Sequence, residues 1–447
     1  MHIVKKILYS LITLFILGSI TESLLFFITD NKEKKNIQIV KNLHQDAWIH
    51  YRDQSLPNAF EKKKRNIWTI HPTYRKRGLP ETKIINPKRG LRLLALGGST
   101  TVGIPFEKEI GGFPKRLEGM LEKQKIQVIN AAVPGMASRS FSKITTQIQD
   151  LEIDAVLIYT GNNEHSSIMY SHCLERQTRR TPTQKILQQL HIYRFLQGIL
   201  SNKVSIDIKI ALERQEDCLS NVARLVHQKQ PNSPLRKDML RDEAIQNFEK
   251  NLSQIVTSHK KTPFFLAIPP INYQTPPNLS LLSPIKSKDE LRNIEKELQS
   301  INLLWKQRLY GKIRKIAERL YSAHPEYALI NYHLGMSEIR VGKEDLGLKH
   351  LQDALEQDWQ PERVTPDLQK VLMKICAKYE NAICVNVDKR FKELAVFEGI
   401  PGRELFVDYC HPTKELGTNE IASVFLRTLI QYDLGIKNDN QPQDNDQ

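Results

Sequence analysis

The chain has 447 residues, of which 40% are hydrophobic and 26% are charged, and its formal net charge is +15. These values predict a folded protein of two domains, or of one domain with large insertions, and exclude a wholly disordered chain. The basic residues lie in short runs mixed with acids, as at 32–35 and 61–65, and the sequence has no zinc-finger spacing. We therefore expect a solvated basic surface and no nucleic-acid partner; the alternative is a face turned toward an acidic envelope or lipid headgroup surface.

The first 30 residues predict a membrane anchor. Residues 7–28 are about 22 mostly apolar residues, enough for a helix to cross a bilayer, although Glu22 interrupts them. The alternative is a cleaved signal peptide with its apolar core at 7–20, but no A-x-A cleavage site follows, which favours an uncleaved anchor. The lysines of MHIVKK favour a single-pass protein of the bacterial cell membrane whose body faces the periplasm or another extracytoplasmic space.

Residues 31–90 are expected to form a polar, partly helical lead-in segment. From 91 to 170, short apolar runs that end in glycine or polar residues alternate with segments of helical spacing. The expected strands cover 91–98, 126–135 and 153–164, and the expected helices cover 111–124 and 141–151. This alternation predicts parallel strands buried between two layers of helices, so 91–170 is expected to be the first half of an α/β domain.

Two helical insertions are expected to interrupt this domain. The first covers 171–260 and the second covers 276–380, and both are rich in charge and helical spacing. Between them, 261–275 contains the apolar run FFLAIPPI, which predicts another strand of the same sheet. The second half of the domain is expected at 381–435. Residues 436–447 have no apolar periodicity and predict a disordered tail.

The second insertion contains one stretch, 326–366, with the pattern of a tetratricopeptide hairpin. The matching small and large positions are Leu334, Gly335, Gly347, Leu351, Ala354 and Pro361. A stacked array needs about three such units, and the sequence has one. The alternative is an ordinary helical hairpin packed on the sheet. A true repeat would offer a surface for a protein partner.

The five cysteines argue against metal and dithiol chemistry, because no C-x-x-C motif occurs. Their number is odd, so at least one is not paired within the chain. Cys376 and Cys384 could form a bridge in an exported protein, but spacing alone leaves that open. Cys410 precedes His411, and neighbours along a chain usually point apart, so we expect Cys410 to have a packing role.

Three strand ends carry residues that suit a catalytic site. Ser99 follows the first strand in GGST, Gly135 follows the second in NAAVPG, and Asn163 follows the third in GNNE. The carboxyl ends of parallel strands form the ligand crevice of an open α/β sheet. If VDYCHP reaches the same edge, Asp408 and His411 join this set.

These residue types fit nucleophilic cleavage of an ester. The Ser99 hydroxyl would attack, His411 would take its proton, and Asp408 would orient the imidazole. The developing oxyanion needs fixed donors, which the amides of Ser99 and Gly135 and the side chain of Asn163 could supply. Asn162 is a rival for the role of Asn163.

The four blocks resemble those of the SGNH hydrolases, the GDSL-type esterases and lipases, over about 91–170 and 380–431. The resemblance implies a flavodoxin-like three-layer α/β/α sandwich with a parallel sheet, and hydrolysis of O-acyl or O-acetyl esters without a metal or cofactor. Two positions depart from the family pattern. Gly98 replaces the aspartate of Gly-Asp-Ser, and Glu164 replaces the final aspartate of Gly-x-Asn-Asp.

We therefore expect a serine-dependent ester hydrolase at the cell envelope that works through an acyl-enzyme. Its substrate would be an acyl ester, such as an acylated saccharide or lipid. One alternative is an O-acyltransferase that acts on envelope saccharides. Another is a catalytically inactive, membrane-anchored scaffold that binds a partner through the helical repeat. Two catalytic motifs of other folds are excluded: LGGSTTVG lacks the G-K-[ST] ending of a P-loop, and Thr101 stands where the α/β-hydrolase elbow has its second glycine.

Overall fold

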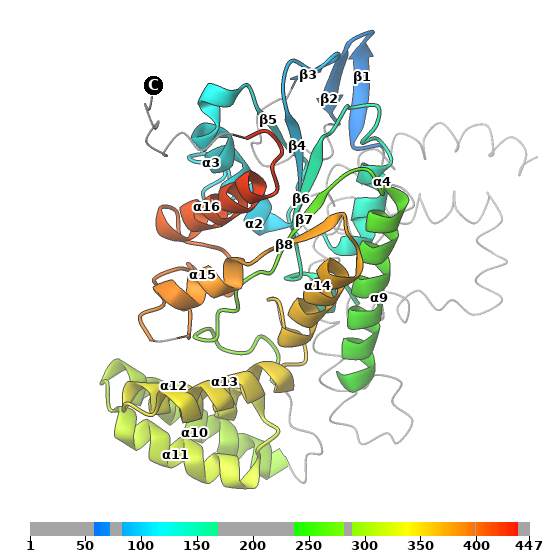
Figure 1. The fold of residues 1–447 in the computed structure, drawn as a ribbon. Helices are drawn as coiled ribbons and strands as arrows, with labels where there is room; N and C mark the ends of the chain where they lie inside the picture. Colours follow the sequence, from blue (N-terminus) through cyan, green and yellow to red (C-terminus); the bar gives the residue numbers. More distant parts are fainter. Residues whose placement is uncertain (1–57, 72–82, 169–236, 281–287, 398, 437–447) are drawn as a thin grey trace, which may run out of the picture. The chain divides into compact units, whose positions relative to one another are not determined.

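The computed structural model of the chain describes residues 58–71, 83–168, 237–280, 288–397 and 399–436 (Figure 1). The chain divides into two compact units, and every described residue belongs to the unit formed by Ile49–Tyr170 and Val222–Gln447. The expected anchor, most of the first helical insertion and nearly all of the expected disordered tail lie outside the described residues. Within the described ranges, no helix combines the length and the apolar character that a bilayer crossing requires.

A five-stranded parallel sheet forms the centre of this unit. Its strands are β4 (Arg92–Gly97), β5 (Gln127–Asn130), β6 (Ala155–Tyr159), β7 (Phe264–Ala267) and β8 (Ala382–Val385). The spatial order is β5-β4-β6-β7-β8, and each neighbouring pair is parallel. Numbered along the chain, this is the order 2-1-3-4-5 of the flavodoxin-like doubly wound sheet. The predicted α/β class with a parallel sheet is confirmed.

Helices cover both faces of the sheet (Figure 1). One face carries α3 (Phe113–Met120), α15 (Val387–Leu394) and α16 (Leu416–Gln431), and the other carries α4 (Phe141–Thr145), α9 (Lys237–Ser258) and α14 (Pro366–Lys378). Successive strand residues point to opposite faces of the sheet. Leu93 therefore packs in the core under α3, α15 and α16, and Leu94 packs in the core under α4, α9 and α14. The near-continuous apolar runs of the sequence therefore fill two cores.

Four helices lie between β7 and α14 in the sequence and correspond to the expected second insertion. They are α10 (Lys288–Lys306), α11 (Tyr310–Ala323), α12 (Ala328–Arg340) and α13 (Glu344–Gln357). Helices α12 and α13 approach closely at two glycines, since a Cβ on Gly335 would lie 2.7 Å from the carbonyl oxygen of Gly347. Met336 and Leu351 join the core on the α9 and α14 face of the sheet. The hairpin thus packs on the α/β domain, and its likeness to a tetratricopeptide unit stays a prediction.

The lead-in segment differs from its prediction. Its described part is a three-stranded antiparallel sheet of β1 (Phe60–Lys64), β2 (Ile67–Ile70) and β3 (Lys83–Ile85), so a partly helical structure is wrong there. Phe60, Ile70 and Ile84 are buried, whereas the lysines around them are exposed. The side chain of Gln147 accepts from the amide of Phe60 and donates to its carbonyl, which fixes the small sheet to the domain.

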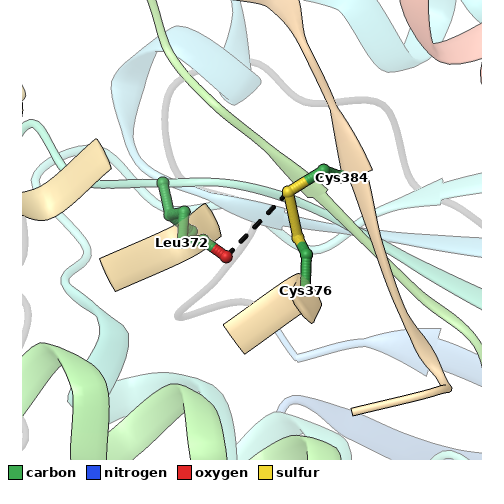
Figure 2. Close-up of a disulfide and its surroundings, with 3 residues drawn as sticks. All are labelled: Leu372, Cys376 and Cys384. Carbon is green, nitrogen blue, oxygen red and sulfur yellow. Dashed lines mark hydrogen bonds between the residues drawn. A yellow bond between two sulfur atoms is a disulfide. The ribbon is translucent and has the colours of Figure 1, made fainter. Parts of the chain in front are cut away.

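A disulfide joins α14 to β8 (Figure 2). It links Cys376 with Cys384, whose Cα atoms are 5.6 Å apart, and the carbonyl oxygen of Leu372 lies 3.9 Å from the Cys384 sulfur. The bridge ties the last strand of the sheet to the helix that precedes it, and it settles the pairing that spacing left open. Cys410 is a buried free thiol, in line with its expected packing role.

Candidate active site

Ser99 stands at the first position of a very short helix, α2 (Ser99–Val102), directly after β4. The tight turn between strand and helix uses Gly97 and Gly98. A Cβ on Gly98 would lie 2.5 Å from the Asn163 side-chain nitrogen. Glycine at residue 98 therefore leaves room for the Asn163 side chain beside the turn that carries Ser99.

The structure brings Ser99, His411 and Asp408 into one hydrogen-bonded chain. Ser99 Oγ lies 2.7 Å from His411 Nε2, and His411 Nδ1 lies 2.6 Å from Asp408 Oδ2. When Nδ1 carries the proton and donates it to the carboxylate, Nε2 is the acceptor for the serine hydroxyl. His411 is buried and the Asp408 side chain is partly exposed. This is the arrangement that activates a serine hydroxyl.

The three-residue spacing between Asp408 and His411 is explained by a tight turn. Asp408 Oδ1 accepts from the backbone amides of Cys410 at 3.0 Å and His411 at 2.8 Å, as aspartate does in an Asx-type turn. Burial alone would raise the pKa of the Asp408 carboxyl. The hydrogen bond and charge of His411, with the two amides, outweigh burial and hold that pKa below its ordinary value. The carboxylate stays ionised beside the imidazole.

The candidate oxyanion donors come from three loops. Ser99 N–H is the first amide of α2, and Gly135 has a positive φ of 73° that favours glycine. Neither amide donates a hydrogen bond to any described residue. The Asn163 side-chain nitrogen donates to the carbonyl of Met136 at 3.2 Å and lies against Gly98. The loops that follow β4, β5 and β6 therefore meet at Asn163.

The geometry distinguishes the two adjacent asparagines. Asn162 is buried, donates to Thr100 Oγ1 at 3.4 Å and accepts from the amide of Val364 at 2.9 Å. Its side chain is therefore occupied in holding loops together. Asn163 lies next to the serine turn and is the better candidate for an oxyanion donor.

Glu164 has a structural position that the sequence did not reveal. It is buried, and its carboxyl oxygens accept from the amide and hydroxyl of Ser138, both at 2.9 Å, and from Thr160 Oγ1 at 3.2 Å. Burial raises the pKa of Glu164 to about 7, against the opposing effect of these hydrogen bonds and of the Arg139 charge. Glu164 thus connects the loop of Gly135 to the loop of Asn163.

Two further segments contact the site and were missed by the sequence analysis. Residues 272–276 reach it through Asn272, whose side chain donates to the carbonyl of Asp408 at 2.6 Å. Residues 358–365, called the strap below, reach it through Val364, as described above. Both contacts involve backbone atoms, and no motif in the sequence marks them.

One cluster among the described residues has the composition of a metal site, namely Asp408, Cys410 and His411, with ligand atoms within 4.8 Å of one another. Its chemistry does not favour a metal. Both Asp408 oxygens already accept hydrogen bonds. Burial also raises the pKa of the Cys410 thiol well above its ordinary value, which disfavours the thiolate that a metal would need. The cluster is better suited to proton transfer.

No protein-family model and no curated protein matches the chain. Solved structures that resemble it include a lipase/acylhydrolase from Enterococcus faecalis, with 10% identity, a TM-score of 0.33, and coverage of 76% of this chain and 96% of the other. The esterase EstA from Pseudoalteromonas sp. has 12% identity, a TM-score of 0.33, and coverage of 76% and 97%. A catalytic mutant of the acetylxylan esterase Axe2 from Geobacillus stearothermophilus has 14% identity, a TM-score of 0.32, and coverage of 76% and 95%. Because these TM-scores are low, the function proposed below depends on the geometry of the site.

Proposed function

We propose that the chain is a serine-dependent carboxylic ester hydrolase of the SGNH type. One observation supports this most strongly: the hydrogen-bonded chain from Ser99 Oγ through His411 to Asp408. Ser99 lies near the start of the α/β domain in the sequence, and Asp408 and His411 lie near its end. In the folded chain the three side chains meet beyond the carboxyl end of β4, where a doubly wound sheet places its ligands.

The proposed reaction has two halves. Ser99 Oγ attacks the acyl carbon while its proton passes to His411 Nε2, and the imidazolium is stabilised by Asp408. His411 then returns the proton to the leaving alcohol as the ester C–O bond breaks, which leaves an acyl group on Ser99. Water, deprotonated by His411, attacks this acyl-enzyme. His411 then returns the proton to Ser99 Oγ as the bond between the acyl carbon and Oγ breaks, and the carboxylic acid leaves.

In each half, negative charge develops on the carbonyl oxygen of the substrate. The amides of Ser99 and Gly135 and the Asn163 side chain are the proposed donors to that oxygen. Donors that are held in place before reaction stabilise the charge without reorganisation. The hydrogen bonds of Glu164 to Ser138 and Thr160 hold two of the three donor loops in position.

The proposed location is the cell envelope, with the body of the protein outside the cytoplasmic membrane and the N-terminal segment as its anchor. The Cys376–Cys384 bridge supports this, because structural disulfides persist in oxidising compartments. The proposed substrate is an O-acyl or O-acetyl ester found there, such as an acylated saccharide or lipid. The α12–α13 hairpin is the proposed surface for a protein partner.

Hydrolysis of p-nitrophenyl acetate by the full-length protein in mild detergent tests the proposal. The wild type should release p-nitrophenol, and Ser99→Ala should reduce release to the background rate. Release that is unchanged in Ser99→Ala would remove Ser99 from the reaction. Transfer of the acetyl group to an added sugar, with less free acetate, would point to the acyltransferase.

A further inference from the structure

The strap (residues 358–365) connects α13 of the helical insertion to α14 of the α/β domain, and it lies against the candidate active site. The amide of Val364 donates to Asn162, next to the proposed oxyanion donor. The Val364 side chain also lies 3.0 Å from the position that a Cβ on Gly161 would take. Thr365 Oγ1 lies 3.1 Å from His165 Nε2. The C-terminal end of the strap is therefore fixed on the loop that follows β6.

Arg363 connects the strap to the catalytic turn. Its side chain is buried, and its guanidinium donates to the carbonyls of Thr275 at 2.9 Å and Pro276 at 2.7 Å. The same segment supplies Asn272, which donates to the carbonyl of Asp408. One buried cation thus organises the loop that supports the acid of the triad.

The other end of the strap is fixed by Asp358. This buried carboxylate accepts from the amides of Asn278 at 2.8 Å, Leu279 at 3.0 Å and Gln360 at 3.0 Å. With Asp358 held at one end and Arg363 to Thr365 held at the other, the backbone on both sides of Glu362 has a defined position.

Glu362 is different from its neighbours in the strap. It is partly exposed, and its carboxylate accepts no hydrogen bond from any residue that the structure describes. Its charge interacts with those of Asp408 and His411. Burial first, and the charge of Asp358 second, raise the pKa of Glu362, while Arg363 opposes them. The backbone of Glu362 is placed near the catalytic turn by its neighbours, since Arg363 holds the carbonyls of Thr275 and Pro276 and Val364 holds Asn162. The charge of Arg363 is also engaged with Asp358.

We propose that Glu362 is a specificity-determining residue that selects substrates by charge: it favours esters with an ammonium group near the scissile bond and disfavours anionic esters. This inference rests on the proposed ester hydrolase function. A carboxylate that accepts no hydrogen bond from the described residues, on a backbone held at both sides, can attract a cation of the substrate and repel an anion. At a partly exposed site, one such charge changes the rate ratio between charged and neutral substrates by about 3- to 10-fold.

Three fluorophosphonate probes of equal length test the proposal. Their alkyl chains end in a trimethylammonium, a tert-butyl or a sulfonate group. Labelling forms a Ser99 Oγ–P bond, releases fluoride and gives the hydroxyl proton to His411. The second-order labelling rates of the full-length protein are measured at about pH 8 and low salt, where surface charges are screened least. In the wild type, the cationic probe should label fastest and the anionic probe slowest.

Glu362→Gln should bring both charged-to-neutral rate ratios toward one, by about 3- to 10-fold. Glu362→Asp keeps the charge and should keep the order of the probes. Asp345→Asn is the matched control, because Asp345 is exposed and lies about 18 Å along α13 from the residue that precedes the strap. It should leave the ratios unchanged.

An equal effect of Glu362→Gln on all three probes, or no effect on the ratios, would overturn the charge selection and leave the hydrolase intact. A wild-type protein that none of the probes labels at Ser99 would instead overturn the proposed function, and the charge selection with it. Raised salt should reduce the differences among the probes in the wild type, which a purely structural role of Glu362 would not predict.

Discussion

The side-chain amide of Asn163 lies so close to Gly98 that a Cβ there would be only 2.5 Å from its nitrogen. The turn that carries Ser99 and the proposed oxyanion donor are therefore in close contact, although they belong to loops after different strands. Glycine at residue 98 and asparagine at residue 163 form one structural unit.

Gly98→Ala tests this relationship. The added methyl group should displace the Asn163 amide and lower kcat by roughly 10- to 100-fold, because an oxyanion donor is moved. Hydrolysis of a short p-nitrophenyl ester measures the effect. Gly119→Ala is the matched control, since a Cβ on this glycine of α3 would have no neighbour within 4 Å, and its kcat should equal that of the wild type. Equal rates for all three proteins would contradict the proposed role of the contact.

Asp408→Asn should lower kcat by roughly three to four orders of magnitude, as expected when a histidine loses the carboxylate that sets its tautomer. Asp408 Oδ1 also holds two backbone amides, which the asparagine oxygen can still accept. The fold should therefore be retained, and circular dichroism with thermal unfolding checks that. A loss of activity smaller than tenfold in a folded variant would show that Asp408 does not orient His411.

Glu164 predicts a pH dependence of stability. Its pKa in the folded state is about 7, above the ordinary value of 4.5, so folding favours the protonated carboxyl. The stabilisation is fully present below about pH 4.5 and is lost as the pH rises through about 7, a change of about 3 kcal/mol. Glu164→Gln imitates the protonated form and does not titrate.

Urea unfolding of the wild type and Glu164→Gln between about pH 4.5 and 8 measures this effect. The variant should gain stability relative to the wild type as the pH rises. Only the wild type has a carboxyl at residue 164 that ionises more readily in the unfolded chain than in the folded one. A difference between the two proteins that is the same at every pH would show that Glu164 has an ordinary pKa.

The disulfide should stabilise the described unit. Cys376 and Cys384 are separated by 8 positions, and closing so short a loop in the unfolded chain is worth roughly 2.5 kcal/mol. A Cys376→Ser, Cys384→Ser double variant should unfold at a lower temperature than the oxidised wild type. Dithiothreitol should lower the Tm of the wild type only. If it lowers both equally, the bridge is absent from the protein in solution.

Strands β4, β5 and β6 of the central sheet and the five candidate site residues could be predicted because each has a local signal. Apolar runs that end in glycine mark β4, β5 and β6, and a candidate site residue follows each run. The structure brings Ser99 and His411 within hydrogen-bonding distance although 312 positions separate them. Parallel strands gather at one edge of a sheet, so this proximity follows from topology.

The remaining parts of the site had no such signal. The strap and residues 272–276 act through backbone groups and buried polar side chains such as Arg363, and their sequence resembles any polar loop. The three small strands were missed because lysines occupy the exposed positions between the buried Phe60 and Ile70. In both cases the contacts with distant segments, rather than local pattern, determine the structure.

Mass-spectrometric mapping of the residue that a neutral fluorophosphonate modifies tests the central claim most directly. We predict one modified peptide, which carries the adduct on Ser99, and loss of labelling in both Ser99→Ala and His411→Ala. Labelling that persists in Ser99→Ala, or an unmodified Ser99 in a folded wild-type protein, would contradict the account.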